Sequence, residues 1–326
     1  MTALDPRGPA HGGRTRIFLW HVHGSYTTAL VQGGHEYFVP VLPDRGPDGR
    51  GRARTWTWPP NVVEVTPDEA RALDVDVVLL QRPHEAELAA AWLGRVPGRD
   101  VRAIYLEHNA PQGRVAEMRH PFADRPDLTL VHVTHFNALF WDGGTTPVRV
   151  IEHGIVDPGY RYTGELPRAA VAINDAVRRG RVTGTDLLDR FARALPLDVF
   201  GIGAGTLGGV EDPPQHVLHA EMPRRRVYLH PMRWTSLGLG LIEAMQLGMP
   251  VVALATTEAV EAVPPGCGVI STDVERLCDA LRRYANDAAR ARADGERARA
   301  YALERYGLER FLRAWDALFA AALACA

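Results

Sequence analysis

The stretch HPMRWTSLGLGLIEAMQLGMPVVALATTEAVEAVPPGCGVIS, from His230 to Ser271, decides the fold. It opens with a loop and continues with an apolar segment over about 239–247 that has the composition of a helix. Two short apolar runs follow, PVVALA from Pro250 and GVIS from Gly268. Short apolar strands that alternate with helices are typical of a doubly wound parallel sheet. This stretch therefore predicts part of such a sheet.

The same alternation of strand-like and helix-like segments runs through the rest of the chain. Other short apolar runs begin at Arg16, Tyr37, Asp76, Val101, Leu128, Val148, Ala169, Leu197 and Val227. Their length and spacing favour buried parallel strands. A chain of 326 residues is too long for one ordinary hydrophobic core. We therefore predict an α/β protein with two Rossmann-like, doubly wound domains.

The domain boundary is placed in the linker PGYRYTGELPR, which begins at Pro158. The expected parts are a flexible tail over residues 1–15, an N-terminal Rossmann-like domain over 16–160, a C-terminal Rossmann-like domain over 161–305, and a C-terminal helix over 306–326 that can pack back on the N-terminal domain. The Gly-, Pro- and Arg-rich segment from Pro43 to Asn61 is expected to be irregular and mobile. Thr272 to Glu275 is expected to be the capping box of the helix that follows.

The charge of the chain gives no global reason to expect nucleic acid or an anionic membrane as a partner, because the formal net charge is −2. The sequence has no lysine, so all 37 basic residues are arginines. Phosphate binding must then depend on arginine, backbone amides and helix N-termini. The arginine bias is typical of a GC-rich, bacterial genome and says nothing about function.

The three cysteines, Cys267, Cys278 and Cys325, lack the paired spacing of a zinc site or a disulfide framework. No run of about 18 apolar residues is present, and the N-terminus lacks the apolar segment of a signal peptide. We therefore expect a cytoplasmic protein without a transmembrane segment or a metal site.

The loop and helix of the decisive stretch have the chemistry of an anion site. Four residues precede the helix: Thr235, Ser236, Leu237 and Gly238. Unpaired backbone N–H groups and the positive end of the helix dipole would stabilise a diphosphate there. Glu243 lies one turn into the helix, where its carboxylate can accept two hydrogen bonds from the vicinal hydroxyls of a ribose. The alternative is a solvated helix carboxylate, which the apolar neighbours of Glu243 disfavour.

The whole stretch resembles the donor-binding region of the retaining glycosyltransferases of family 4. In that family a loop, a helix bearing LEAMA-x-G-x-P-VV-A, a strand and a second Gly-rich loop follow in the same order. The resemblance implies the GT-B fold, with two Rossmann-like domains that face each other across a cleft. It also implies metal-independent transfer of a sugar, with retention, from a nucleotide diphosphate sugar to an acceptor hydroxyl. The implied partners are that donor and an unknown acceptor, no cofactor is implied, and the protein is expected to be a monomer or homodimer.

An arginine-rich loop lies upstream of the decisive stretch. Arg178, Arg179 and Arg181 precede a predicted helix start at Thr183 and Gly184. The loop resembles the family's Gly-Arg-…-Lys-Gly phosphate clamp, with Thr183 in the lysine position. Arg178 and Arg181 are three residues apart and can share a face, but the spacing does not decide which arginine binds phosphate. A solvated loop is the alternative.

Two positions depart from the family pattern in the C-terminal half. Thr235 stands where the family has a second glutamate near the transferred sugar, and it can hydrogen-bond a hydroxyl but carries no charge. Thr256 and Thr257 replace the glycines of the second loop, while Glu261 matches the glutamate that follows them in the family. The alternative for this loop is an ordinary helix start capped by Thr257.

In the N-terminal half, Gly24 and Ser25 occupy the first strand-to-helix turn, which in the family approaches the donor phosphates and the acceptor. His108, in the stretch YLEHNAP, resembles the family histidine that reaches the transferred sugar. It follows a predicted strand, and ligands of open α/β sheets bind beyond the carboxyl ends of strands. A purely structural histidine is the alternative.

Two other functions are compatible with the sequence. A sugar-nucleotide epimerase on the same fold would share the diphosphate site but needs a carboxylate acid/base pair that we cannot assign. A catalytically silent nucleotide-sugar-binding protein would explain Thr235, whereas Glu243 and the arginine loop argue for an intact donor site.

Overall fold

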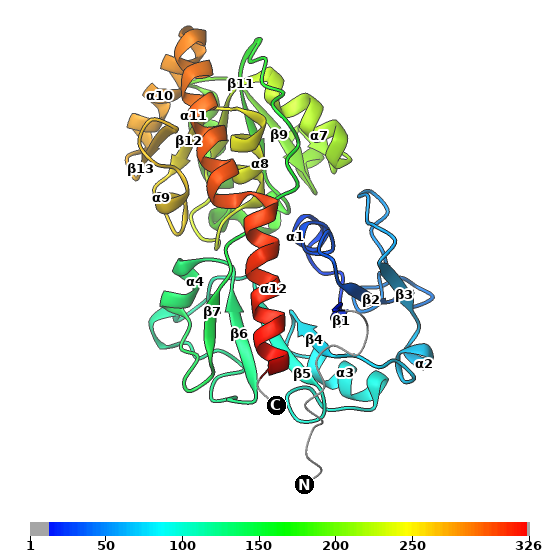
Figure 1. The fold of residues 1–326 in the computed structure, drawn as a ribbon. Helices are drawn as coiled ribbons and strands as arrows, with labels where there is room; N and C mark the ends of the chain where they lie inside the picture. Colours follow the sequence, from blue (N-terminus) through cyan, green and yellow to red (C-terminus); the bar gives the residue numbers. More distant parts are fainter. Residues whose placement is uncertain (1–12, 325–326) are drawn as a thin grey trace. The chain divides into compact units, whose positions relative to one another are not determined.

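The computed structural model describes residues 13–324, and the expected tail lies almost entirely outside these residues. The chain forms two compact units (Figure 1). Unit 1 consists of the residues up to Gly154 together with those from Leu308 onward, and unit 2 consists of Ile155–Gly307. The chain therefore passes from unit 1 into unit 2 and returns to unit 1.

Unit 1 is built on a parallel sheet of seven strands in the order β3-β2-β1-β4-β5-β6-β7. Its strands are β1 (Arg16–Leu19), β2 (Glu36–Pro40), β3 (Val62–Val65), β4 (Val77–Leu80), β5 (Arg102–Glu107), β6 (Leu128–His132) and β7 (Val148–Val150). Its α-helices are α1 (Gly24–Leu30), α2 (Pro67–Ala70), α3 (Glu85–Leu93), α4 (His135–Phe140) and α12 (Leu308–Ala324). The strand order reverses at β1, which pairs with both β2 and β4, so ligand chemistry is expected at the carboxyl ends of the central strands.

The helix α12 supplies part of the core of unit 1. Its residues Phe311, Trp315 and Phe319 are almost completely buried. The indole Nε1 of Trp315 donates to the hydroxyl of Tyr26 at 3.1 Å, and the rings of Phe311 and Tyr26 pack edge to face. Unit 1 is therefore incomplete without a segment that follows unit 2 in the sequence.

Unit 2 contains a second parallel sheet, of six strands in the order β10-β9-β8-β11-β12-β13. Its strands are β8 (Leu166–Ala172), β9 (Leu197–Gly201), β10 (Val210–Glu211), β11 (Arg225–His230), β12 (Val251–Leu254) and β13 (Gly268–Ser271). Its α-helices are α5 (Ala176–Arg179), α6 (Leu188–Ala192), α7 (Gln215–Glu221), α8 (Leu239–Leu247), α9 (Ala259–Ala262), α10 (Val274–Asn286) and α11 (Ala288–Tyr306). The predicted α/β class with two doubly wound sheets is confirmed.

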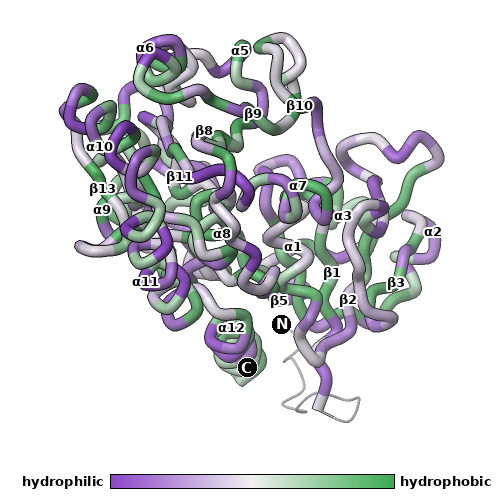
Figure 2. The backbone as a smooth tube through the Cα atoms, turned by 90° about the horizontal axis from the view of Figure 1, so that it is seen from above, coloured by the Kyte–Doolittle hydropathy of each residue, from purple (hydrophilic) through white to green (hydrophobic). Residues whose placement is uncertain are grey.

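The outer helices of unit 2 are amphipathic. In Figure 2, α10 and α11 alternate between hydrophilic and hydrophobic colours, as expected for helices with one buried face. In α10 the buried side includes Leu277, Leu281 and Tyr284. None of the helices within residues 13–324 is both long enough and apolar enough to cross a bilayer.

One local prediction about a helix start is wrong. The first C-terminal helix is capped by Asp273, whose carboxylate accepts from the backbone N–H groups of Glu275 and Arg276, so Thr272 is not the N-cap. An aspartate carboxylate is as good a cap as a threonine hydroxyl, and it moves the helix start by one residue. The helical stretch predicted to open at Thr183 and Gly184 does begin after Gly184, first as a 3₁₀ turn over Thr185–Leu187 and then as the regular helix α6 from Leu188.

The segment 43–61 is irregular, as predicted, but a network of hydrogen bonds holds it in place. Arg45 donates to both carboxylate oxygens of Glu64, at 2.9 and 3.0 Å. Arg52 donates to the carbonyl of Trp58 at 2.7 Å, and the indole of Trp58 donates to Thr28 at 2.8 Å. These contacts argue against the mobility expected from composition.

Candidate functional site

In unit 2, the loop 231–238 connects the end of β11 to α8. Gly238 is the N-cap of α8 and has an extended backbone, and as a glycine it makes no side-chain cap hydrogen bond to the first turn of the helix. A Cβ on Gly238 would lie 2.8 Å from Cε1 of His230, so the loop packs directly on that ring. Burial lowers the pKa of His230 to about 4, which keeps the ring neutral. The N–H groups at the start of α8 have the anion-binding character expected from the sequence.

The predicted loop residues are not equally exposed. Ser236 and Leu237 are buried, whereas Thr235 is half-buried. The backbone N–H groups of Arg233 and Trp234 both donate to the carbonyl of Val182, at 2.9 and 3.1 Å. The loop before α8 is therefore anchored to the arginine-rich loop that follows β8.

Glu243 is only 5% exposed, so the alternative of a solvated helix carboxylate is wrong. The amide Nε2 of Gln215 donates to its Oε1 at 3.2 Å. The Nε2 atom of His219 lies 3.5 Å from its Oε2. Both partners come from α7 and were missed by sequence reasoning, although their spacing of four residues places them on one face of a helix.

The three arginines of the upstream loop differ in their surroundings. The side chain of Arg178 is 73% exposed and pairs with Asp175 at 2.5 Å. That of Arg181 is 78% exposed and pairs with Asp186 at 3.2 Å. Arg179 is half-buried, and its guanidinium makes no hydrogen bond or ion pair with any residue of the described chain. Burial, and then the charge of Arg178, lower the pKa of Arg179, and the nearby Asp175 carboxylate offsets only part of this shift, so an anion placed there would stabilise the charged guanidinium.

The side chain of Thr183 makes hydrogen bonds within the arginine-rich loop. It is fully buried, and its hydroxyl donates to the carbonyl of Gly180 at 3.1 Å and lies 2.9 Å from the hydroxyl of Thr185. This hydroxyl is committed to local bonding, unlike the long, charged lysine that stands at this position in the resembled motif.

The loop after β12 contains a left-handed residue where the family pattern has glycine. Thr257 has φ +51°, a conformation that glycine adopts without cost. The N-cap of α9 is Glu258, so the alternative of a helix capped by Thr257 is wrong. Glu261 is exposed, whereas Glu258 is 2% exposed and pairs with Arg305 at 3.2 Å. The hydroxyl of Thr256 donates to the carbonyl of Met232 at 2.7 Å, which ties this loop to the one before α8.

In unit 1, His108 follows β5 and lies in a group of buried aromatic rings. Its ring centroid is 4.0 Å from that of His23 and 4.7 Å from that of Tyr26, which also packs against His153. We call His23, His108 and His153 the histidine cluster. Burial lowers the pKa of His23 to about 4 and that of His153 to about 3, and it holds the pKa of His108 well below 6.5. All three rings are therefore neutral at pH 7.

The hydrogen bonds around His108 fix its tautomer. Gln81 donates through its amide Nε2 to the carbonyl of Trp20 at 2.7 Å, so its Oε1 faces His108 at 3.0 Å. Nε2 of His108 is then the donor and Nδ1 the acceptor. Next to it, the Glu107 carboxylate accepts from the backbone N–H of Asn109 at 2.6 Å and from His120 at 3.0 Å. The turn that carries His108 is therefore held from both sides.

Gly24 and Ser25 are the first two residues of α1, directly after His23. A Cβ on Gly24 would lie 3.1 Å from Nε1 of Trp56, so the indole of the segment 43–61 lies against this turn. Sequence reasoning assigned the turn to the site, but it did not foresee that the irregular segment supplies an aromatic side chain there.

Two of three comparisons with known proteins found similar proteins. Residues 203–287 match the family model for glycosyl transferases group 1. This range includes the loop 231–238, α7 and α8, and for that part of the chain it confirms a resemblance to the group 1 glycosyltransferases. No curated protein matches the sequence significantly.

Solved structures share the fold at low sequence identity. Sucrose-phosphate synthase from Thermosynechococcus elongatus superposes with a TM-score of 0.75 at 14% identity, covering 96% of this chain and 100% of that one. HepE of Anabaena in complex with UDP superposes with a TM-score of 0.64 at 13% identity, covering 94% and 100%. AviGT4, a glycosyltransferase involved in avilamycin A biosynthesis, gives 0.63 at 18% identity, covering 96% and 99%. The fold is therefore that of the GT-B glycosyltransferases.

Proposed function

We propose that this protein is a retaining glycosyltransferase, which transfers a sugar from a nucleoside diphosphate sugar to an acceptor hydroxyl. The observation that carries the proposal is Glu243, a buried carboxylate one turn into α8, a helix whose N-cap is a glycine and which lies inside the segment that matches the group 1 model. A carboxylate at that place suits the two hydroxyls of a ribose, while the N–H groups at the start of the helix suit the diphosphate.

Negative charge develops on the departing nucleoside diphosphate during transfer. The N–H groups at the start of α8 and the Arg179 guanidinium would stabilise that charge in unit 2, and fixed donors of this kind are a large contribution to catalysis. Arg179 is the best candidate of the three arginines because Arg178 and Arg181 already pair with carboxylates. Since arginine and amides meet the charge, we propose that transfer needs neither a metal ion nor a cofactor.

The candidate residue of unit 1 for the transfer step, His108, is an uncharged group. His108 is held as a neutral imidazole with a fixed tautomer, which suits a hydrogen bond to an uncharged sugar hydroxyl rather than to phosphate. We therefore assign His108 to the transfer step and not to nucleotide binding. Thr235 would contribute a hydroxyl, and not a charge, to the binding of the sugar.

The test begins with a thermal-shift screen against UDP, GDP, ADP and TDP. UDP is the first choice because the Anabaena protein was solved with UDP and with UDP-glucose. The matching nucleotide sugars are then assayed for hydrolysis and for transfer to candidate acceptors, with and without EDTA. NMR of the product shows whether the anomeric configuration is retained.

Each outcome bears on one part of the proposal. Stabilisation by a nucleotide without turnover of any sugar, with acceptors supplied, would favour a catalytically silent binding protein, as Thr235 suggests. Loss of turnover in EDTA would contradict metal independence, and an inverted product would contradict retention.

A further inference from the structure

The helix α7 presents two donor side chains to Glu243. Gln215 begins this helix and His219 lies one turn later, so the two side chains share a face. The Gln215 amide reaches Oε1 of Glu243 at 3.2 Å, and Nε2 of His219 lies 3.5 Å from Oε2. His219 is 7% exposed, and its Nε2 makes no hydrogen bond within residues 13–324. A buried ring nitrogen without a hydrogen-bond partner is costly, and this one lies beside the carboxylate.

A ribose diol needs more than a carboxylate. An ionised carboxylate only accepts hydrogen bonds, whereas each hydroxyl donates one and can accept others. If both hydroxyls donate to Glu243, their remaining lone pairs need donors. An amide N–H₂ and an imidazole N–H beside the same carboxylate supply them. His219 Nε2 and Glu243 Oε2 are 3.5 Å apart, so one hydroxyl oxygen can lie at an ordinary hydrogen-bond distance of about 2.8 Å from both atoms.

We infer that Gln215 and His219 complete the ribose site as hydrogen-bond donors and that, with Glu243, they make the protein select ribonucleotides over deoxyribonucleotides. The inference rests on the proposed function, because it takes Glu243 as the ribose ligand. In the absence of nucleotide, Gln215 holds the carboxylate in place. In its presence, His219 Nε2–H donates to the hydroxyl that it shares with Glu243.

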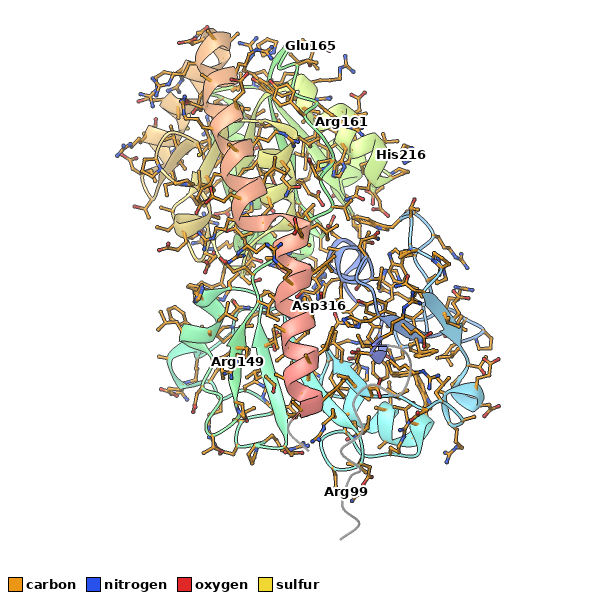
Figure 3. The ribbon with its side chains drawn as sticks, viewed as in Figure 1. Arg99, Arg149, Arg161, Glu165, His216 and Asp316 are labelled. Carbon is orange, nitrogen blue, oxygen red and sulfur yellow. The ribbon has the colours of Figure 1, made fainter. Side chains whose placement is uncertain are left out.

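The variants are His219→Ala, His219→Gln, Gln215→Ala and Glu243→Gln, with His216→Ala as the matched control. His216 lies on the same helix but is exposed (Figure 3), so its loss tests for a general effect of changing α7. His219→Gln keeps a side-chain N–H donor of similar reach. Calorimetry measures the Kd of each folded variant for UDP, 2′-deoxy-UDP and 3′-deoxy-UDP, and the corresponding GDP and ADP series are run in parallel.

We expect His219→Ala to weaken binding of the ribonucleotide about tenfold, the effect of losing one good hydrogen bond to a buried group. Binding of at least one deoxy form should then change by less than about twofold, because the hydroxyl that His219 contacts is already missing. His219→Gln should restore most of the lost affinity. Gln215→Ala should act in the same direction with a smaller effect, and His216→Ala should bind as wild type does.

An equal loss for UDP and both deoxy forms in His219→Ala, without rescue by His219→Gln, would show that His219 has only a structural role and would overturn the inference. If Glu243→Gln weakens binding but His219→Ala and Gln215→Ala do not, the inference fails while the proposed function stands. If no nucleoside diphosphate binds the wild-type protein, the proposed function fails as well.

Discussion

The two units carry the same kind of parallel sheet but opposite chemistry at the loops that follow their strands. In unit 1 the candidate residues are histidines that burial keeps neutral, with His108 and His153 almost completely enclosed. In unit 2 they are an arginine loop, the N–H groups at the start of α8 and the buried carboxylate of Glu243. Under the proposed function, the charged nucleotide suits the residues of unit 2 and the uncharged sugar hydroxyls suit those of unit 1. The group 1 family segment lies wholly within the charged unit.

The largest expected difference between the units is their stability in acid. In unit 1, burial lowers the pKa of His153 to about 3 and that of His132 to about 4. In unit 2, burial lowers the pKa of His230 to about 4. These folded-state pKa values lie below the ordinary 6.5. The stability that comes from burying the neutral rings is therefore complete above pH 6.5 and falls as the pH drops toward about 4. At pH 5 each such histidine costs about 2 kcal/mol, so unit 1 should lose more stability than unit 2.

Tryptophan fluorescence can follow this loss, because six of the seven tryptophans lie in unit 1 and only Trp234 lies in unit 2. The urea midpoints of unfolding measured by tryptophan fluorescence at pH 7 and pH 5 are compared with the midpoints measured by circular dichroism at the same pH values. His132→Leu removes a ring whose two nitrogens make no hydrogen bond with any described residue, and it should reduce the pH dependence. A fluorescence midpoint that does not change with pH would contradict the expectation.

Next in size is the effect of His108→Ala on the rate of transfer. If unit 1 serves the chemical step, this change should lower the transfer rate about 100-fold and leave nucleotide affinity within about twofold. Transfer assays and calorimetry measure the two quantities on the same preparation. The control is His135→Ala, because His135 is exposed on α4. Wild-type turnover in His108→Ala would return His108 to a structural role.

Arg179→Ala should have the opposite profile. Loss of a half-buried guanidinium should weaken binding of the nucleoside diphosphate about 10- to 100-fold, while binding of the nucleoside changes little. Arg178→Ala and Arg181→Ala should cost less, since their guanidinium groups already pair with Asp175 and Asp186. A larger loss in either of these two variants would move the phosphate clamp to that residue.

The lower end of the range extends furthest for Glu243→Gln. Replacing the carboxylate with an amide keeps the shape but weakens the hydrogen bonds to the ribose, so affinity for the nucleoside diphosphate should fall by about 1 to 3 kcal/mol. Calorimetry on the folded variant measures the change, with exposed Glu304→Gln on α11 as control. Unchanged affinity would remove Glu243 from the nucleotide site.

The sequence predicted the fold well because the strands are buried on both faces. Runs such as Val77–Leu80 and Val251–Leu254 are apolar at every position, which indicates parallel strands under helices. The burial of Glu243 was also predictable, since its neighbours in α8 are apolar. These features depend on residues that are close together in the sequence.

The arrangement of the sites could not be predicted in the same way. The histidine cluster joins residues that follow β1, β5 and β7, and only the strand order brings them together. Arg178, Arg179 and Arg181 look equivalent in the sequence, and the positions of Asp175 and Asp186 distinguish them. Gln215 and His219 are 28 and 24 residues from Glu243, so no local motif connects them.

The position of α12 has a consequence for synthesis on the ribosome. Phe311, Trp315 and Phe319 belong to the core of unit 1 but are translated after all of unit 2. Domains usually fold in the order in which they emerge, yet here unit 2 can finish folding while unit 1 still waits for its final helix. During that interval Tyr26 lacks its partners on α12, and a nascent chain at this stage exposes an apolar surface that chaperones recognise. A stop codon just before Leu308 would therefore impair the first half of the protein more than the second.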